Sequence, residues 1–325
     1  SLGIALYTTF AERKVAAILQ DRPGPNRVGP FGLFQPFADG LKLIMKEDII
    51  PTHSNKVLFV MGPIIAMSAA LMTSAIIPWS SSIELFGRQI NLQVTDINIG
   101  ILYAFAVVSM GVYGIMIGGW ASNNKFSLLA ALRGASQAIS YELAMGLSLV
   151  ALILLTGSLS LKTIVQQQID NNHFWNIVYQ PLGFFIFFVC ALAECNRAPF
   201  DMPEAESELN FGYHQEYSSM KLGFYLFAEY VNMIMSSAIM VCLYFGGYDI
   251  PFLNEQILPQ NIAAILGIVA FLIKIIIFIF VFMWIRWTIP RFRYDQLMKL
   301  GWRTFIPLSL FNLLLTAFLT LYFNK

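Results

Sequence analysis

The sequence predicts an all-α integral membrane protein with eight transmembrane helices in a single domain, residues 1–325. The chain is 57% hydrophobic and only 12% charged, and its mean hydropathy is +0.65. Soluble domains usually contain about 25% charged residues. The apolar residues also form long runs with few or no charges, and a spanning helix needs roughly 20 such residues. Composition and run length therefore agree on the same class.

The expected spans follow one another along the chain, joined by short polar segments. Only about ten residues precede Glu12 in the first span, so we expect the native first helix to begin upstream of Ser1. In the third span Gly114 and Gly118 form a GxxxG pair, which predicts close packing against another helix. The eight spans are expected at about 2–19, 57–77, 97–120, 135–156, 175–193, 222–245, 262–285 and 305–323.

The distribution of basic residues predicts the orientation. Sixteen of the twenty Lys and Arg residues fall in joins on one side. The other side has Arg88, Lys162 and Lys325, and Lys274 lies inside a span. By the positive-inside rule, the basic side faces the cytoplasm of a bacterium or the matrix of a mitochondrion.

The long join before the second span has two parts on this basic side. Residues 22–32 contain three Pro and three Gly, which predicts an irregular segment. Residues 33–48 have helical periodicity, with Phe34 and Phe37 on the apolar side, and we expect an amphipathic helix in the interface plane. Such a helix either packs on its own bundle or forms one wall of a lateral opening for a lipid-like ligand.

A second basic-side segment, residues 194–216, is unusually acidic. It holds six of the nineteen acidic residues and one base, Arg197. Pro199 and Pro203 keep its middle out of a regular helix. The charge pattern fits a loop that handles protons or attracts cations at a cavity mouth, and equally a solvated acidic loop. Its acidic residues are Glu194, Asp201, Glu204, Glu206, Glu208 and Glu216.

Three charged residues lie inside the predicted spans that follow the first one. Glu142 and Glu229 are each about eight residues from the basic end of their helix, roughly 11 Å deep. Lys274 is twelve residues from Arg286, about 18 Å deep and near the bilayer middle. Ionisable groups at this depth are costly unless they are paired or hydrated, so we expect a function. We predict a ladder of groups leading inward from the acidic loop, and the alternative is pairing that only locks helices.

The sequence argues against a redox or metal cofactor held by this chain. His53, His173 and His214 all lie outside the predicted spans, which excludes haem bound by two histidines within the bilayer. The three cysteines lack the spacing of a disulfide framework, a metal site or an iron–sulfur cluster. If the protein takes part in redox chemistry, we expect other chains to carry the electrons.

Several long strings resemble subunit 1 of respiratory complex I, the H subunit of NADH:quinone oxidoreductase, over nearly the whole chain. They are AERKVAAILQDRPGPNRVGPFGLFQPFADGLKLIMKE, LRGASQAISYELAMG, ECNRAPFDMPEAESEL, LFAEY and RWTIPRFRYDQLMKLGW. The resemblance implies an eight-helix subunit that forms a quinone chamber with peripheral-arm subunits, one of which carries the terminal iron–sulfur cluster. It also implies coupling of quinone reduction to proton translocation, through small membrane subunits toward antiporter-like subunits.

Position by position, the resemblance also implies roles for individual residues. It implies that the substrate is ubiquinone or menaquinone, that lipids surround the subunit and that no metal is bound. The implied quinone-binding residues are Glu12, Arg13, Arg22, Arg27, Phe34, Asp39, Arg197, Arg291 and Arg293. The implied proton-coupling residues are Glu142, Glu194, Asp201, Glu204, Glu206, Glu208, Glu229 and Lys274.

Three other functions compete with this one. The homologous membrane subunit of an energy-converting hydrogenase would share the fold and the acidic loop without quinone. A stand-alone proton- or cation-coupled transporter is disfavoured, because the sequence shows no inverted pair of broken helices. A purely structural anchor is disfavoured by the ionisable residues within the spans.

Overall fold

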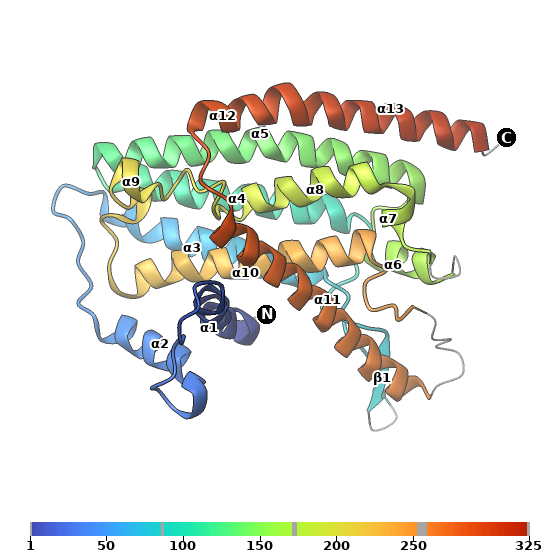
Figure 1. Ribbon diagram of the computed structural model, residues 1–325, viewed down its shortest axis with the longest axis horizontal. Helices are drawn as coiled ribbons and strands as arrows, with labels where there is room; N and C mark the ends of the chain where they lie inside the picture. Colours follow the sequence, from blue (N-terminus) through green and yellow to red (C-terminus); the bar gives the residue numbers. More distant parts are fainter. Residues whose placement is uncertain (1, 86–87, 171–173, 252–258, 324–325) are drawn as a thin grey trace.

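The computed structural model describes residues 2–85, 88–170, 174–251 and 259–323, and it is a bundle of long helices lying side by side (Figure 1). Within these ranges, six helical segments are long and apolar enough to cross a membrane, which supports the predicted all-α membrane class. They are α3 with the 3-10 turn η2 (Lys56–Ile76), α4 (Gly100–Ala121), α5 (Lys125–Thr156), α10 (Ser219–Tyr244), α11 (Gln260–Thr288) and the C-terminal segment Tyr294–Tyr322. His173, Lys325 and the side chain of Glu206 lie outside the described part.

The two remaining predicted spans are helices that do not meet these criteria of length and composition. Helix α1 (Leu2–Leu19) contains three charged residues, Glu12, Arg13 and Lys14, which are too many for these criteria. Helix α8 (Pro181–Glu194) has 14 residues, about 21 Å of helix against a hydrocarbon core of about 30 Å. The short α7 (Asn176–Tyr179) precedes it, and a break at Gln180 separates the two.

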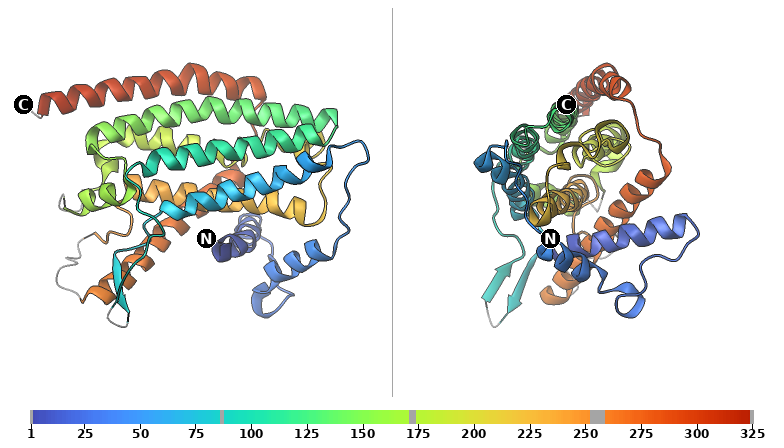
Figure 2. Two further views of the ribbon diagram at one scale, coloured as in Figure 1. Left: turned by 180° about the vertical axis from the view of Figure 1, so that it is seen from behind. Right: turned by 90° about the vertical axis from the view of Figure 1, so that its left-hand side faces the viewer.

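Helix α10 occupies the centre of the bundle. It contacts α1, α2, α3, α8 and α11, and most of its side chains are buried (Figure 2). Its carboxylate, Glu229, is therefore enclosed by protein rather than by lipid. This enclosure is what makes an ionisable group tolerable at such depth.

The glycines of α4 allow the close helix packing that the sequence predicted. A Cβ atom on Gly114 would lie 2.7 Å from the backbone nitrogen of Ala66 on α3. One on Gly118 would lie 2.0 Å from the hydroxyl of Tyr225 on α10. The Tyr225 hydroxyl donates a hydrogen bond to the carbonyl of Gly114, at 3.0 Å. Helices α3, α4 and α10 thus pack closely at Gly114 and Gly118, because glycine has no side chain to keep them apart.

Two helix boundaries differ from the prediction. Helix α5 begins at Lys125, ten residues before the predicted span, and the side chain of Asn124 accepts a hydrogen bond from the Phe126 amide. Residues 286–303, expected as a loop, are largely helical. After α11 ends, α12 (Tyr294–Lys299) continues through the π-helical η5 (Leu300–Phe305) into α13 (Ile306–Phe323). The predicted bounds were the points where charged residues end an apolar run. A helix is held by local backbone hydrogen bonds, so it can continue beyond those charged residues.

The joins at one end of the bundle contain structure that the apolar runs did not reveal. Strands β1 (Ser82–Leu85) and β2 (Arg88–Asn91) pair in antiparallel fashion, with Ser82 opposite Asn91. The Glu84 amide donates to the side chain of Asn261 at the start of α11, 2.8 Å away. Helix α6 (Leu161–Asp170) lies in the next join at this end.

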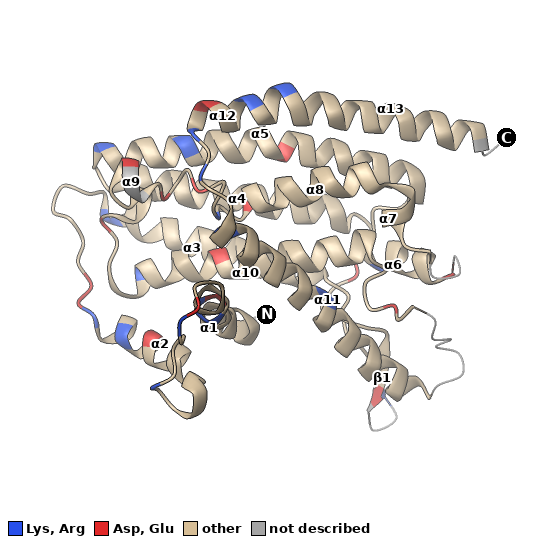
Figure 3. Cartoon of the chain, in the orientation of Figure 1, with Lys and Arg blue, Asp and Glu red and all other residues tan. Residues whose placement is uncertain are grey.

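The joins at the other end carry most of the charge. Figure 3 shows Lys and Arg gathered at the end where α2, α9 and α12 lie, as the sequence predicted. The long first join contains the 3-10 turn η1 (Pro30–Gly32) and the amphipathic α2 (Gln35–Met45), shorter than the predicted 33–48. The acidic segment contains α9 (Glu206–Leu209) and the 3-10 turn η3 (Gly212–His214), and residues 195–205 before them are irregular, as Pro199 and Pro203 predicted.

Candidate functional site

A cavity of about 310 Å³ lies among α1, α2, α10, α11 and the acidic segment. Its walls include apolar side chains such as Leu6, Leu43, Leu226 and Phe227. A cavity with apolar walls and converging polar groups suits an amphipathic small molecule. The charged and polar residues that line it are Thr9, Arg13, Asp39, Arg197, Glu204, Tyr230 and Arg286.

Behind this cavity, Glu12 of α1 is almost fully buried and has three polar partners. The hydroxyl of Tyr230 donates to its Oε2 at 2.6 Å, and Arg286 forms an ion pair with its Oε1. Arg197 Nη1 lies 3.5 Å from Oε2. A buried carboxylate requires such compensation, so Glu12 links α1, α10 and α11.

Arg197 occupies the centre of the charge cluster. Its Nη2 lies 3.5 Å from Glu229 Oε2, and its guanidinium carbon lies 4.2 Å from the centroid of the Tyr230 ring. The cation–π contact and the two carboxylates hold the guanidinium on the cavity wall. The structure thus brings Glu229, which the resemblance assigned to proton coupling, together with Glu12 and Arg197, which it assigned to quinone binding.

Glu229 and Glu204 approach each other from different elements. Tyr213 donates a hydrogen bond to Glu229 Oε1 at 3.2 Å. Glu204 lines the cavity, and its Oε1 lies 3.7 Å from Nδ1 of the buried His214. The acidic segment therefore folds back onto the middle of α10.

Asp201 connects the acidic segment to the segment that follows α11. Arg291 forms an ion pair with its carboxylate, and the Phe292 amide donates to the Pro199 carbonyl at 3.3 Å. Burial raises the pKa of Asp201 to about 6, although Arg291 acts in the opposite direction. Arg291 therefore anchors the loop, and it does not line the cavity.

Two further acids of this segment with described side chains, Glu208 and Glu216, do not gather around Glu204. Glu208 forms an exposed ion pair with Arg133, at 2.6 Å. Glu216 accepts a hydrogen bond from the side chain of Asn124, at 2.8 Å. Thus one part of the segment turns inward to the cavity, and another part is the solvated surface that the alternative interpretation described.

Glu194 and Glu142 lie on the other side of Glu229. Glu142 accepts a hydrogen bond from Ser109 on α4. Glu194 is partly buried, and its Oε2 is enclosed and has no hydrogen-bond partner among the described residues. A small cavity of about 30 Å³ is lined by Glu194, Tyr213 and Glu229. This volume is large enough for about two water molecules.

Lys274 does not join this ladder. Its ammonium group donates to the carbonyls of Phe245 and Asp249, both at 2.7 Å, and lies 4.6 Å from the Trp175 ring. Phe245 is sixteen residues from Glu229 along α10, about 24 Å. The predicted depth was misleading because α11 crosses the bundle obliquely, so distance along this helix is not depth beside α10 (Figure 1).

The other predicted quinone-binding residues divide into two groups. Arg13 and Asp39 form an ion pair at 2.7 Å on the cavity wall and connect α1 to α2. Arg22 donates instead to Gln20, at 2.8 Å. The remaining ones are exposed or partly exposed and do not line the cavity: Arg27, Phe34 and Arg293.

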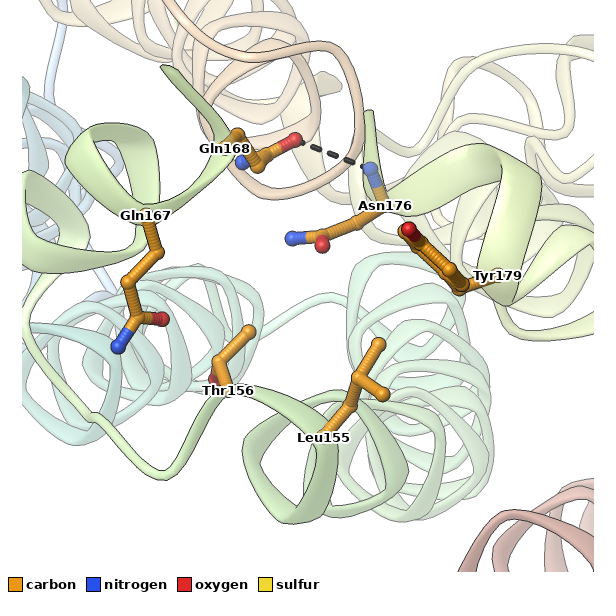
Figure 4. A pocket seen from close by; sticks show the side chains of 6 residues that line it. All are labelled: Leu155, Thr156, Gln167, Gln168, Asn176 and Tyr179. Carbon is orange, nitrogen blue, oxygen red and sulfur yellow. Dashed lines mark hydrogen bonds between the residues drawn. The ribbon is translucent and has the colours of Figure 1, made fainter. Parts of the chain in front are cut away.

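A separate cavity of about 120 Å³ lies at the opposite end of the bundle and is lined mainly by uncharged polar side chains (Figure 4). Gln168 accepts a hydrogen bond from the Asn176 amide at 3.1 Å, and its Nε2 donates to the Cys242 carbonyl at 3.0 Å. These bonds connect α6 and α7 to the end of α10. They are structural, and none of the described residues that line this cavity is a carboxylate or a base.

Comparison with known proteins decides the family. The family model described as NADH dehydrogenase matches residues 1–317. The chain belongs to this family. A relative in Cytophaga hutchinsonii, named as an H subunit of NADH-quinone oxidoreductase, is 65% identical over 98% of this chain and 92% of its own length. The protein of the same name in Flavobacterium psychrophilum is 62% identical over 99% of this chain and 94% of its own length, and that in Leptospira biflexa is 47% identical over 99% and 92%.

Three residues of this family member's site were missed by the sequence analysis. Tyr230 and Arg286 both contact Glu12, and His214 faces Glu204. Tyr230 directly follows Glu229 in the chain, so its proximity to an intramembrane acid was the only available signal. In the sequence analysis Arg286 only marked the basic end of its span, and His214 was only a residue outside the spans.

Proposed function

We propose that this chain is the membrane subunit of a proton-pumping NADH:quinone oxidoreductase and that quinone binds in its 310 Å³ cavity. The names of the relatives support the oxidoreductase and favour quinone over a hydrogenase partner. The observation that carries the quinone site is the junction of apolar walls with Arg197, Tyr230 and Arg286. Ubiquinone or menaquinone has this combination, an apolar tail and a ring with two carbonyl oxygens.

Each part of the cavity has a role in this proposal. The hydroxyl of Tyr230 and the guanidinium of Arg197 are donors that suit a quinone carbonyl. Leu226 and Phe227 suit the isoprenoid tail. The exposed apolar face of α2, which includes Phe37 and Leu41, borders the entrance, and we place α2 in the membrane interface. Peripheral-arm subunits would complete the chamber.

Reduction of quinone to quinol consumes two electrons and two protons. In this proposal the electrons come from the terminal iron–sulfur cluster of a neighbouring subunit. This chain positions the quinone ring, and its charged side chains respond to the negative charge that develops on the ring. Negative charge that develops on the ring attracts Arg197, which weakens its pairing with Glu12 and Glu229. Glu229 then gains a proton more readily, because its compensating charge has moved.

The proton shift would continue away from the quinone. The 30 Å³ cavity connects Glu229 to Glu194, and Glu142 with its Ser109 partner lies beyond. We propose that this route leads through small membrane subunits toward antiporter-like subunits. Lys274 lies outside it, so we assign Lys274 to the packing of α11 against the end of α10.

The membrane topology follows the same proposal. We propose that α1 and α8 complete a set of eight spans, with α8 embedded among neighbouring helices that compensate for its 14 residues. The basic end of the bundle would face the cytoplasm, and the bacterial relatives favour a bacterial plasma membrane over a mitochondrial inner membrane.

A cavity-filling substitution tests the quinone site. Gly40 lines the cavity, and an added Cβ meets nothing within 4 Å, so Gly40→Phe should fold and obstruct the cavity. Gly3→Phe is the matched control, because Gly3 has equal space but lies outside the cavity. We expect Gly40→Phe to lower quinone-linked NADH oxidation about tenfold, which corresponds to about 1.4 kcal/mol. NADH oxidation by an artificial acceptor should persist. Full quinone activity in Gly40→Phe would refute the site.

A further inference from the structure

Three ligand-type side chains converge beside the quinone cavity. Glu204 belongs to the irregular loop, His214 to η3 and Glu229 to α10. One potential ligand atom from each lies within 4.8 Å of the other two. Two of these side chains are buried and the third is partly buried, so this is an enclosed group rather than a surface acidic patch.

His214 has the properties of a metal ligand. Its side chain is only 1% exposed, and neither ring nitrogen has a hydrogen-bond partner among the described residues. Its Nδ1 faces Glu204, 3.7 Å away. Tyr213 packs on the ring, with centroids 3.8 Å apart.

We propose that Glu204, His214 and Glu229 form a binding site for a divalent transition-metal ion, and that Zn²⁺ bound there inhibits quinone-coupled turnover. One histidine and two carboxylates are ordinary zinc ligands, and a water molecule from the adjoining cavity would take the fourth position. Imidazole favours Zn²⁺ over Mg²⁺ or Ca²⁺.

The geometry needs only small side-chain movements. Zn²⁺ binds nitrogen and oxygen at about 2.0–2.2 Å, so two ligands of a tetrahedral ion lie about 3.4 Å apart. The pair His214–Glu204 is already close to this value at 3.7 Å. Glu229 must move toward them, and a rotation of its side chain provides the remaining distance.

The surrounding charges permit a cation. Glu12, Glu204 and Glu229 face Arg197 and Arg286, so three carboxylates and two guanidinium groups leave one formal negative charge. A metal ion would replace Arg197 as the partner of Glu229, and Arg197 would keep Glu12 and Tyr230. Inhibition rests on the proposed function, because a metal-bound Glu229 can neither gain nor lose its proton. Binding of the metal does not depend on that function.

The test uses the whole purified oxidoreductase, washed with a chelator and titrated with Zn²⁺. We expect Zn²⁺ to inhibit NADH oxidation by quinone and to spare oxidation by an artificial acceptor. His214→Asn should raise the half-inhibiting concentration about tenfold or more. His53→Asn, which changes an exposed histidine on the same side, should leave it unchanged. Equal sensitivity of His214→Asn and the wild type would overturn the proposal.

A structural measurement keeps the proposal testable if His214→Asn does not assemble. A cryo-EM map of the wild-type complex with Zn²⁺ should show density between His214 and Glu204. The absence of density there in the presence of Zn²⁺ would overturn the site. If the wild type does not reduce quinone at all, the proposed function fails. Zn²⁺ density at these residues would still confirm the site in that case.

Discussion

Arg197 and Glu229 form an ion pair in the interior of the bundle, with Nη2 3.5 Å from Oε2 and both side chains at most 7% exposed. Arg197 is on an irregular loop, and Glu229 is in the middle of the central helix α10. The pair therefore fixes the loop against the membrane-embedded part of the protein. The guanidinium of Arg197 lines the 310 Å³ cavity, and the carboxylate of Glu229 lines the separate 30 Å³ cavity. The pair therefore stands between the two cavities.

Glu229→Gln should impair quinone-coupled turnover. The amide fills the same space beside the 30 Å³ cavity, but it cannot take up or release a proton there. We expect at least a tenfold loss of NADH:quinone activity, or about 1.4 kcal/mol. Oxidation of NADH by an artificial acceptor should persist, whereas loss of both activities would indicate failed assembly. Glu47→Gln at an exposed position is the control for removal of a carboxylate on the basic side.

Arg197→Met should destabilise the protein by about 3–5 kcal/mol, because it leaves Glu12 and Glu229 with less compensation in the interior. The double variant Arg197→Met/Glu229→Gln should recover part of this loss, since one of the uncompensated carboxylates is gone. Thermal unfolding midpoints of the purified complexes give the comparison. Additive losses in the double variant would argue that the two residues do not interact.

Gly118→Ala should disturb the packing of α4 against α10, since the new methyl group would lie 2.0 Å from the Tyr225 hydroxyl. Overpacking of this kind costs about 1–3 kcal/mol. Gly111→Ala on the same helix is the matched control, because its nearest contact would be the Ala69 Cβ at 3.8 Å. The yield of assembled protein and the unfolding midpoint should fall only for Gly118→Ala. Equal behaviour of the two variants would contradict the packing account.

Asp201 should make stability depend on pH in a defined direction. Burial raises its pKa from 3.8 to about 6, so between these values the folded protein keeps a proton that the unfolded chain has released. The favourable contribution is complete below about pH 4 and is lost as the pH rises through about 6. The unfolding midpoint of the wild type, relative to that of Asp201→Asn, should therefore fall between pH 4 and 6. A rise in this interval would show that Arg291 outweighs burial.

The sequence analysis was successful where the signal was local in the chain. Long apolar runs predicted the helices, and Gly114 and Gly118 predicted a close helix contact. The positions of the bases predicted a charged end of the bundle. It was less successful at boundaries, because helix α5 extends past a charged stretch to Lys125 and the hairpin β1–β2 is too short to stand out from its join.

By itself, the sequence determined the membrane class, the basic and acidic segments and the identity of most charged residues at the site. Only the tertiary structure decided which of them meet. It placed Arg197 between Glu12 and Glu229, and it placed Lys274 against Phe245, which is about 24 Å from Glu229 along α10. The physical reason is that depth along one helix fixes neither its tilt nor its rotation. Those are set by packing against other helices, and therefore by side chains far away in the chain.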